Sequence, residues 1–144
     1  MKVESILKAK GSSVTTTTPD ATIATIIRVL KDKNIGALVV SEDGSTVLGL
    51  IAERAIVHGL CDYGTRLLDL RVSDLMTRTV LTCAPGDSLT RVMAQMTRYR
   101  VRQLPVVEDG KLRGIVSIGD VVKYRLDELE LEANILRDAF LARR

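Results

Sequence analysis

Two segments of the chain place their large apolar residues at the spacing of an amphipathic helix. The first segment contains Ile23, Ile26, Ile27 and Leu30, and the second contains Leu89, Val92, Met93 and Met96. Both sets follow the i, i+3, i+4, i+7 pattern, which brings the side chains to one face of a helix. The pattern therefore predicts one helix with a buried face in each half of the chain.

Two short apolar runs follow each predicted helix and have the length of strands. The first runs cover residues 36–41 and 103–108, and the second runs cover residues 47–52 and 112–117. Each first run leads into a Glu-Asp-Gly turn, which is typical of a β-hairpin. Further apolar-periodic segments begin near Glu53 and Ile118, and shorter segments with a similar pattern occur at 3–7 and 72–76. Each half is thus predicted to fold as (α)-β-α-β-β-α.

The two halves are copies of one repeat. Pro19 and Pro85 are 66 residues apart, as are Gly44 and Gly110, whereas Gly49 and Gly114 are 65 apart. A half of about 60 residues buries too little apolar surface to be stable alone. We therefore expect an α/β (α+β) fold in which the halves pack as one pseudo-two-fold pair. The predicted boundaries are a first repeat at 1–61, a linker at 62–71, a second repeat at 72–129 and a helical tail at 130–144.

The tail carries an apolar stripe that needs a partner. Leu129, Leu136 and Phe140 fall near one helical face, with acidic residues early in the segment and Arg143 and Arg144 at its end. This order of charges suits the helix dipole. We expect the stripe to pack on its own module in preference to a dimer partner or a target protein, because such stripes usually serve the core.

Composition narrows the class of protein. Hydrophobic residues make up 46% of the chain and aromatic residues 3%, so the core is expected to consist of aliphatic side chains and Met. The 21 basic and 18 acidic residues are mixed along the chain, which disfavours nucleic acid as the main partner. No apolar run has the length of a membrane span and none resembles a signal peptide, so a cytoplasmic location is expected.

The sequence lacks the motifs of a catalytic or metal site. Cys61 and Cys83 are isolated and His58 is the single histidine, so neither a zinc spacing nor a redox motif is present. No Lys follows a Gly-rich loop, and there is no Gly-x-Ser-x-Gly motif. Ser5 and Lys8 match a Ser-x-x-Lys pattern whose companion motifs are missing. The chain is therefore predicted not to be an enzyme.

Three blocks of the sequence match motifs that are typical of a known family. They read Asp74-Leu-Met-Thr, Val101-Arg-Gln-Leu-Pro-Val-Val-Glu-Asp-Gly and Gly114-Ile-Val-Ser-Ile-Gly-Asp-Val-Val. In this order they resemble tandem cystathionine-β-synthase (CBS) repeats, the pair also called a Bateman module. The resemblance implies clefts between the repeats that commonly bind AMP, ADP, ATP, S-adenosylmethionine or NAD. It also implies a regulatory module without catalysis that forms a homodimer and reports to an effector protein, which the sequence does not name.

The second repeat keeps the ribose-phosphate signature of the family in Ser117 and Asp120. A carboxylate can accept hydrogen bonds from both ribose hydroxyls, while a serine and free N–H groups at a helix start can face phosphate. Both residue types also cap helices routinely, which is the alternative explanation. The resemblance favours ligand binding over simple capping.

The first repeat departs from the signature, since it reads Ala52-Glu-Arg-Ala55 at the matching position. Without a hydroxyl and an acid, the site that this repeat organises is expected to be empty, altered or weak. Arg54 is a candidate for a phosphate contact through its guanidinium, and a solvated residue at the helix start is an equal alternative.

The other candidate ligand residues come from the second repeat. Arg100 and Arg102 alternate in an extended segment and so point the same way, where the resemblance places ligand phosphates; solvent-facing arginines are an equal alternative. Pro105 lacks an N–H, so its strand is expected to be irregular or at an edge, which leaves room for a ligand. By resemblance Thr79 and Val80 would contact adenine, with plain strand packing as the alternative.

Two functions therefore remain open from the sequence. One is a sensor of an adenine nucleotide, which Ser117 and Asp120 favour. The other is a ligand-free structural or protein-interaction module, for which Ala52 and Ala55 leave room.

Overall fold

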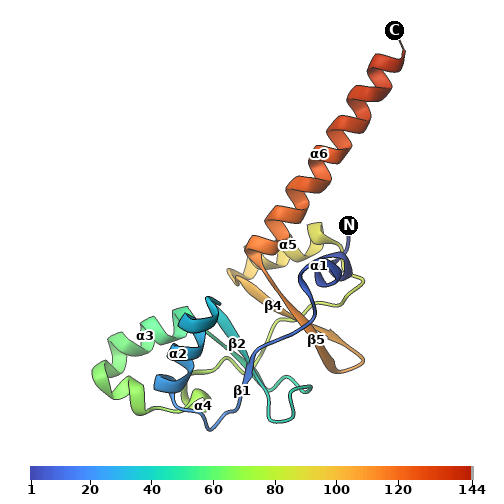
Figure 1. Ribbon diagram of the computed structural model, residues 1–144. Coiled ribbons are helices and arrows are strands. Elements are labelled where there is room, and N and C mark those ends of the chain that lie inside the picture. The colour runs from blue at the N-terminus through green and yellow to red at the C-terminus, as the bar shows by residue number, and fades with distance from the viewer. Residues whose placement is uncertain (144) are drawn as a thin grey trace.

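The computed structural model describes residues 1–143, which form two small sheets with helices packed around them (Figure 1). The first half contains α1 (Val3–Lys10), β1 (Thr16–Thr17), α2 (Ile23–Lys33), β2 (Ala37–Val40), β3 (Gly49–Ala52) and α3 (Glu53–Tyr63). A 3₁₀ helix, η1 (Gly64–Asp69), leads into the second half, which contains α4 (Val72–Leu75), α5 (Leu89–Tyr99), β4 (Gln103–Glu108), β5 (Lys111–Ser117) and α6 (Ile118–Ala142). This order confirms the predicted α/β repeat.

Helices α2 and α5, which occupy equivalent positions in the two halves, begin with equivalent caps and end in equivalent left-handed turns. Thr22 Oγ1 accepts a hydrogen bond from the Thr25 N–H (3.3 Å), and Ser88 Oγ accepts one from the Arg91 N–H (3.2 Å). Such caps satisfy backbone donors that the first turn of a helix leaves unpaired. After α5 the chain turns through Arg100, whose φ of 53° is left-handed, and this turn sends the segment that follows toward β4.

The hairpins are paired as predicted, but their turns differ in length. β2 is antiparallel to β3, and β4 is antiparallel to β5 with a bulge between Val106 and Val107. β3 begins at Gly49, two residues later than the predicted run, because the preceding loop folds around Asp43. The Asp43 carboxylate accepts hydrogen bonds from the N–H groups of Ser45 (2.8 Å) and Thr46 (2.7 Å).

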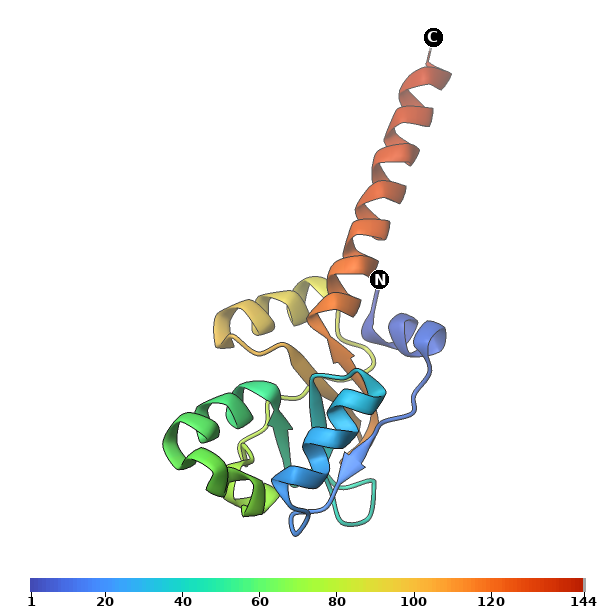
Figure 2. The same ribbon diagram turned by 60° about the vertical axis from the view of Figure 1, so that its left-hand side comes forward.

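The leading helix of each half packs on the core of the other half. Val3 and Ile6 of α1 are fully buried in the core of the second repeat, beside α5, β4 and β5. Val72 of α4 is buried in the core of the first repeat, beside α2 and η1. Figures 1 and 2 both place α1 beside the start of α6. The two repeats therefore exchange an element and fold as one unit.

The last helix extends far beyond the body of the molecule (Figures 1 and 2). α6 runs without a break from Ile118 to Ala142, and Leu129, Leu136 and Phe140 are exposed. The expectation that this stripe packs on its own module is therefore wrong. The physical reason is that no Gly or Pro occurs after Gly119 to end the helix, so it continues in one direction past the body.

Two general findings complete the description of residues 1–143. No helix in this range combines the length and the apolarity that crossing a membrane requires. The same range contains no cluster of three or more His, Cys, Asp or Glu side chains that could hold a metal ion.

Candidate functional site

A cavity of about 800 Å³ lies between the two repeats. One wall is the start of α3, at Ala52 to Ala55, and the opposite wall comes from the second half, at Thr77, residues 79–81 and residues 99–103. Its volume is in the range typical of small-molecule sites. The cavity therefore belongs to both repeats and cannot form from either one alone.

Five of the candidate ligand residues line this cavity. They are Arg54, Thr79, Val80, Arg100 and Arg102. Arg54 reaches across it, because its Nη1 donates a hydrogen bond to the backbone carbonyl of Arg100 (3.3 Å). Three guanidinium groups against one nearby acid, Glu53, give the cavity a positive character that suits an anionic ligand.

Much of the remaining lining is apolar. Leu50, Val80, Leu81 and Val101 contribute apolar side chains to it. Tyr99 and His58 also line the cavity, although neither was predicted from the sequence as a ligand residue. His58 stands four residues after Arg54 on α3, and this helical spacing was the signal that could have identified it.

The α3 end of the cavity has no side-chain cap. Ala52 occupies the N-cap position of α3 and offers no hydrogen-bond acceptor. Ala55 stands where the family signature has its acid, so no carboxylate is available at that position for a ribose. The N-terminal turn of α3 thus contributes backbone donors and a positive dipole end, and Arg54 adds a full charge.

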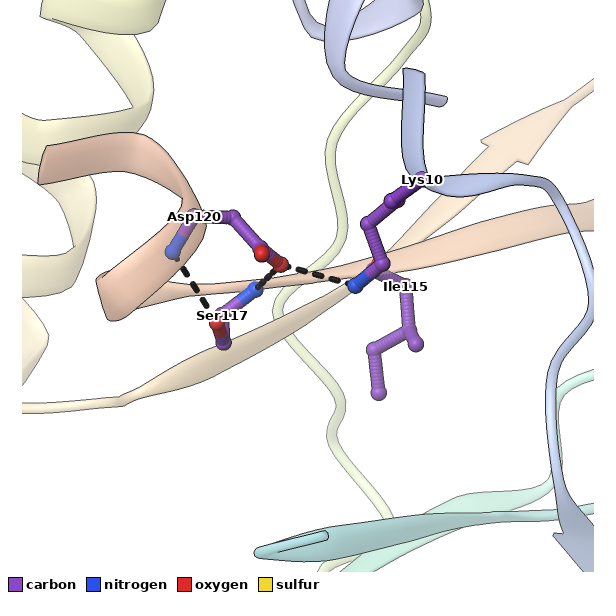
Figure 3. A network of polar contacts seen from close by, with 4 residues as sticks. All are labelled: Lys10, Ile115, Ser117 and Asp120. Atoms are coloured by element: carbon purple, nitrogen blue, oxygen red, sulfur yellow. Dashed lines mark hydrogen bonds and ion pairs between the residues drawn. The ribbon is translucent and has the colours of Figure 1, made fainter. Parts of the chain in front are cut away.

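Ser117 and Asp120 lie away from this cavity, at the start of α6 (Figure 3). They form a reciprocal capping box, in which the Asp120 N–H donates to Ser117 Oγ (3.1 Å) and the Ser117 N–H donates to Asp120 Oδ2 (2.9 Å). The capping alternative raised by the sequence is therefore present in the structure. Their role toward a ligand stays a prediction.

Lys10, at the end of α1, forms an ion pair with Asp120, whose carboxylate the family signature assigns to ribose binding (Figure 3). Its Nζ lies 2.7 Å from Asp120 Oδ2 and 3.1 Å from the carbonyl oxygen of Ile115. Burial by itself would raise the pKa of Asp120, but the hydrogen bonds from Lys10 and Ser117 and the charge of Lys10 hold it below the usual aspartate value. The Lys10 ammonium group therefore competes with a ribose for Asp120 Oδ2.

Pro105 is buried within β4 and does not line the cavity. It pairs in register with Ile115 of β5, and its carbonyl accepts a hydrogen bond from the Cys83 N–H (3.0 Å). The strand is irregular nearby, as predicted, because the bulge follows at Val106 and Val107.

The fold and the cavity define a tandem-repeat module that encloses a ligand-sized space between its two copies. The sequence profile of the CBS domain matches residues 7–62 and 72–127. The chain therefore belongs to the CBS-domain family, as a tandem pair.

Known proteins resemble the chain over most of its length. The crystal structure of the CBS-domain containing protein ATU1752 from Agrobacterium tumefaciens has a TM-score of 0.83 and 40% identity, and the match covers 86% of this chain and 92% of that one. The mitochondrial protein CBSX3 of Arabidopsis thaliana is 33% identical over 88% of this chain. The inosine-5'-monophosphate dehydrogenase of Nitrosopumilus maritimus is 29% identical over 71% of this chain. The chain spans 65% of the length of CBSX3 and 20% of that of the dehydrogenase.

Proposed function

We propose that the chain is a regulatory module that binds an adenosine-containing nucleotide in the cavity between its repeats. The observation that carries this proposal is the placement of Arg54, Arg100 and Arg102 around an apolar cavity of about 800 Å³. The arginines would hold the phosphates, because a guanidinium forms paired, charge-assisted hydrogen bonds to phosphate oxygens. The apolar wall formed by Val80, Leu81 and Val101 would take the adenine.

Recognition in this cavity would depend on the phosphates more than on the ribose. Ala55 offers no carboxylate to the ribose hydroxyls, whereas three arginines line the cavity and would bind phosphate. Affinity is therefore expected to rise with the number of phosphate groups, from AMP to ADP to ATP. NAD and S-adenosylmethionine are the other members of the ligand class.

A second site at Ser117 and Asp120 is part of the proposal, and it would be weaker in the structure as described. Asp120 is already bound to Lys10, and Ser117 is already engaged in the capping box. A ribose there would compete with Lys10 for the Asp120 carboxylate, which lowers the net gain from binding. The cavity at α3 is therefore the principal site.

The module would act by reporting nucleotide to an effector protein and not by catalysis. A dehydrogenase among its relatives contains a similar segment in a much longer chain, which fits a regulatory role beside an enzyme. The free thiol of Cys61 is exposed, which fits the reducing environment of the cytoplasm.

Thermal unfolding with a panel of ligands tests the proposal. AMP, ADP, ATP, NAD and S-adenosylmethionine are added separately, with GTP and CTP as controls, and freshly purified protein is examined by native mass spectrometry for bound nucleotide. A ligand at 100 times its Kd stabilises the native state by about 2.7 kcal/mol. We expect adenine nucleotides to raise Tm and the controls to do less. If no member of the panel shifts Tm at millimolar concentration, the ligand-free interaction module is the correct assignment.

Matched variants locate the site. Arg102→Gln and Arg54→Gln remove cavity charges, whereas Arg28→Gln removes an exposed charge from α2, outside the cavity lining. The first two are expected to weaken ATP binding by about tenfold each, and Arg28→Gln is expected to leave it unchanged. Equal effects of all three would show that ATP is held by general charge attraction alone.

A further inference from the structure

The projecting part of α6 carries a heptad pattern of small and large apolar residues. Its positions are Val122, Leu126, Leu129, Ala133, Leu136 and Phe140, separated alternately by four and three residues. This spacing is that of the a and d positions in a coiled coil. All six residues belong to the exposed part of the chain, and Leu126, Leu129 and Leu136 are 60%, 43% and 71% exposed. We call this row of residues the α6 seam.

The seam faces away from the packed body along its whole length. Val121, the buried residue of α6, is on a different face from Val122 and Leu126. From Leu129 onward every described residue of the helix is exposed, and Figures 1 and 2 show this part standing clear of both repeats. A projecting helix of this length is marginal in water without a partner, because tertiary packing supplies most helical stability.

The charges that flank the seam are arranged for a parallel partner. With Leu129 and Leu136 at d, Arg125 and Glu132 take the g positions, and Glu130 and Arg137 take the e positions. In a parallel two-stranded coiled coil, each g residue faces the e residue five positions later in the other chain. Arg125 would then face Glu130, and Glu132 would face Arg137, so both pairs are of opposite charge and each occurs twice by symmetry.

An antiparallel pair would bring like charges together. The middle of the seam, between Val122 and Phe140, falls at Leu131. Full antiparallel overlap would therefore gather Glu130 and Glu132 of both chains around one point. Four acidic side chains at the centre would weaken that arrangement, since like charges across a helix interface repel.

We propose that α6 pairs with α6 of a second copy of this chain as a parallel two-stranded coiled coil through residues 122–140. The occupant is a second copy because the seam and its flanking charges complement themselves. Glu130, Glu132 and Arg137 form no ion pair within residues 1–143 and are free to take these contacts, whereas Arg125 would exchange its ion pair with Glu128 of its own helix for the contact between chains. Leu131, Ile135 and Leu141 fall at positions f, c and b, outside the seam. The inference does not depend on nucleotide binding.

Cysteine cross-linking tests the parallel register directly. In a Cys61→Ser background, which removes the exposed native thiol, Leu136→Cys is compared with Asn134→Cys. A parallel pair places the two 136 positions side by side at d, whereas position 134 is a b site on the outer surface. Mild oxidation is expected to link most of the Leu136→Cys protein into a disulfide dimer and to leave the Asn134→Cys protein largely monomeric on a denaturing gel. Equal cross-linking of the two variants would overturn the proposal.

Charge reversal provides a second test, in which a double variant is expected to restore dimerisation. Glu132→Arg and Arg137→Glu each convert two attractive contacts into repulsive ones, and each is expected to raise the dimer dissociation constant by roughly tenfold. The double variant restores opposite charges in the parallel pair and is expected to return the constant to the original value. Neither residue has an oppositely charged neighbour at i±3 or i±4 on its own helix, so the substitutions break no ion pair within α6.

The same measurement recognises the antiparallel alternative. Glu132→Arg would relieve the acidic centre of an antiparallel pair and so strengthen it, and the double variant would not return to the original constant. Sedimentation velocity of the full chain over a dilution series gives these constants. A strengthened Glu132→Arg dimer, or a monomer at all concentrations for the unmodified chain, contradicts the proposal.

Discussion

Lys10 and Asp120 form an ion pair, with 2.7 Å between Nζ and Oδ2, that joins the end of the first helix to the start of the last. The pair lies at the point where α1 of the first repeat rests on the second repeat. The same carboxylate also caps α6. The Asp120 side chain therefore contacts α1, which packs on the second repeat, and also stabilises the start of the projecting helix. The contact therefore ties the two ends of the fold together.

This ion pair predicts a specific loss of stability in acid. The pKa of Asp120 is lowered in the folded chain, so its contribution to stability is complete above the unfolded value of about 3.9 and is lost as the pH falls through the lower folded pKa. Asp120→Asn is expected to destabilise the protein by about 1 kcal/mol at pH 7. The difference between the two proteins should shrink below about pH 4.

Urea unfolding at several pH values measures this difference. Asp32→Asn is the control, because Asp32 is exposed on α2 and forms no ion pair within residues 1–143. A gap between wild type and Asp120→Asn that stays constant down to pH 2.5, well below the usual aspartate range, would show that Lys10 and Ser117 do not favour the ionised carboxylate.

Ala55→Asp is predicted to strengthen nucleotide binding in the cavity. The substitution places a carboxylate at the position where the family signature has one, beside Arg54 at the start of α3. A charged hydrogen bond contributes about 1.5–3 kcal/mol, so AMP is expected to bind about tenfold more tightly or better. Isothermal titration calorimetry compares this variant with Ala24→Asp, which adds the same charge to an exposed position of α2. Tighter binding in both variants, or in neither, would refute the assignment of Ala55 to the ribose side.

Gly49→Ala is predicted to destabilise the fold by about 1–3 kcal/mol, since added atoms in a packed position force neighbours to move. A Cβ at Gly49 would lie 2.9 Å from the backbone oxygen of Thr77 and 2.9 Å from Met76 Sδ. Thr77 is also bonded in both directions to Leu50, which holds one wall of the cavity against β3.

Gly86→Ala is the matched control for this substitution. A Cβ at Gly86 would meet no atom within 4 Å, so its effect on the free energy of unfolding is expected to be near zero. Chemical denaturation gives both values. A Gly49→Ala protein as stable as Gly86→Ala would mean that the wall at Thr77 can move away without cost.

The two cysteines are predicted to differ in reactivity. Cys61 is exposed, whereas Cys83 is 4% exposed, and burial together with the charge of Asp87 raises the pKa of its thiol to about 12. A disulfide reagent at pH 8 is expected to modify one thiol rapidly in the native protein and both after denaturation, because the thiolate is the reactive form. Cys61→Ser should abolish the rapid phase. Rapid modification of native Cys61→Ser protein would contradict the buried placement of Cys83.

The sequence by itself determined the repeat, the order of its elements and the hairpins, because hydrophobic spacing and turn residues are local properties of the chain. It also identified the arginines and the residues Thr79 and Val80 that line the cavity. The family motif identified Ser117 and Asp120 as candidates, because a motif describes residue types along the chain. It does not describe which residues lie next to them in the fold. Lys10 is 110 positions away from Asp120 in the sequence, and no local pattern predicts their contact.

Tertiary structure alone decided which surfaces meet. α1 and α4 each pack on the core of the other repeat, and the hydrophobic spacing within each helix does not specify this choice. The same holds for the cavity, whose walls come from both halves of the chain. α6 continues in one direction because no helix-breaking residue interrupts it. Its exposure, however, depends on where the packed body of the molecule ends, because burial is a property of the whole fold and not of a single segment.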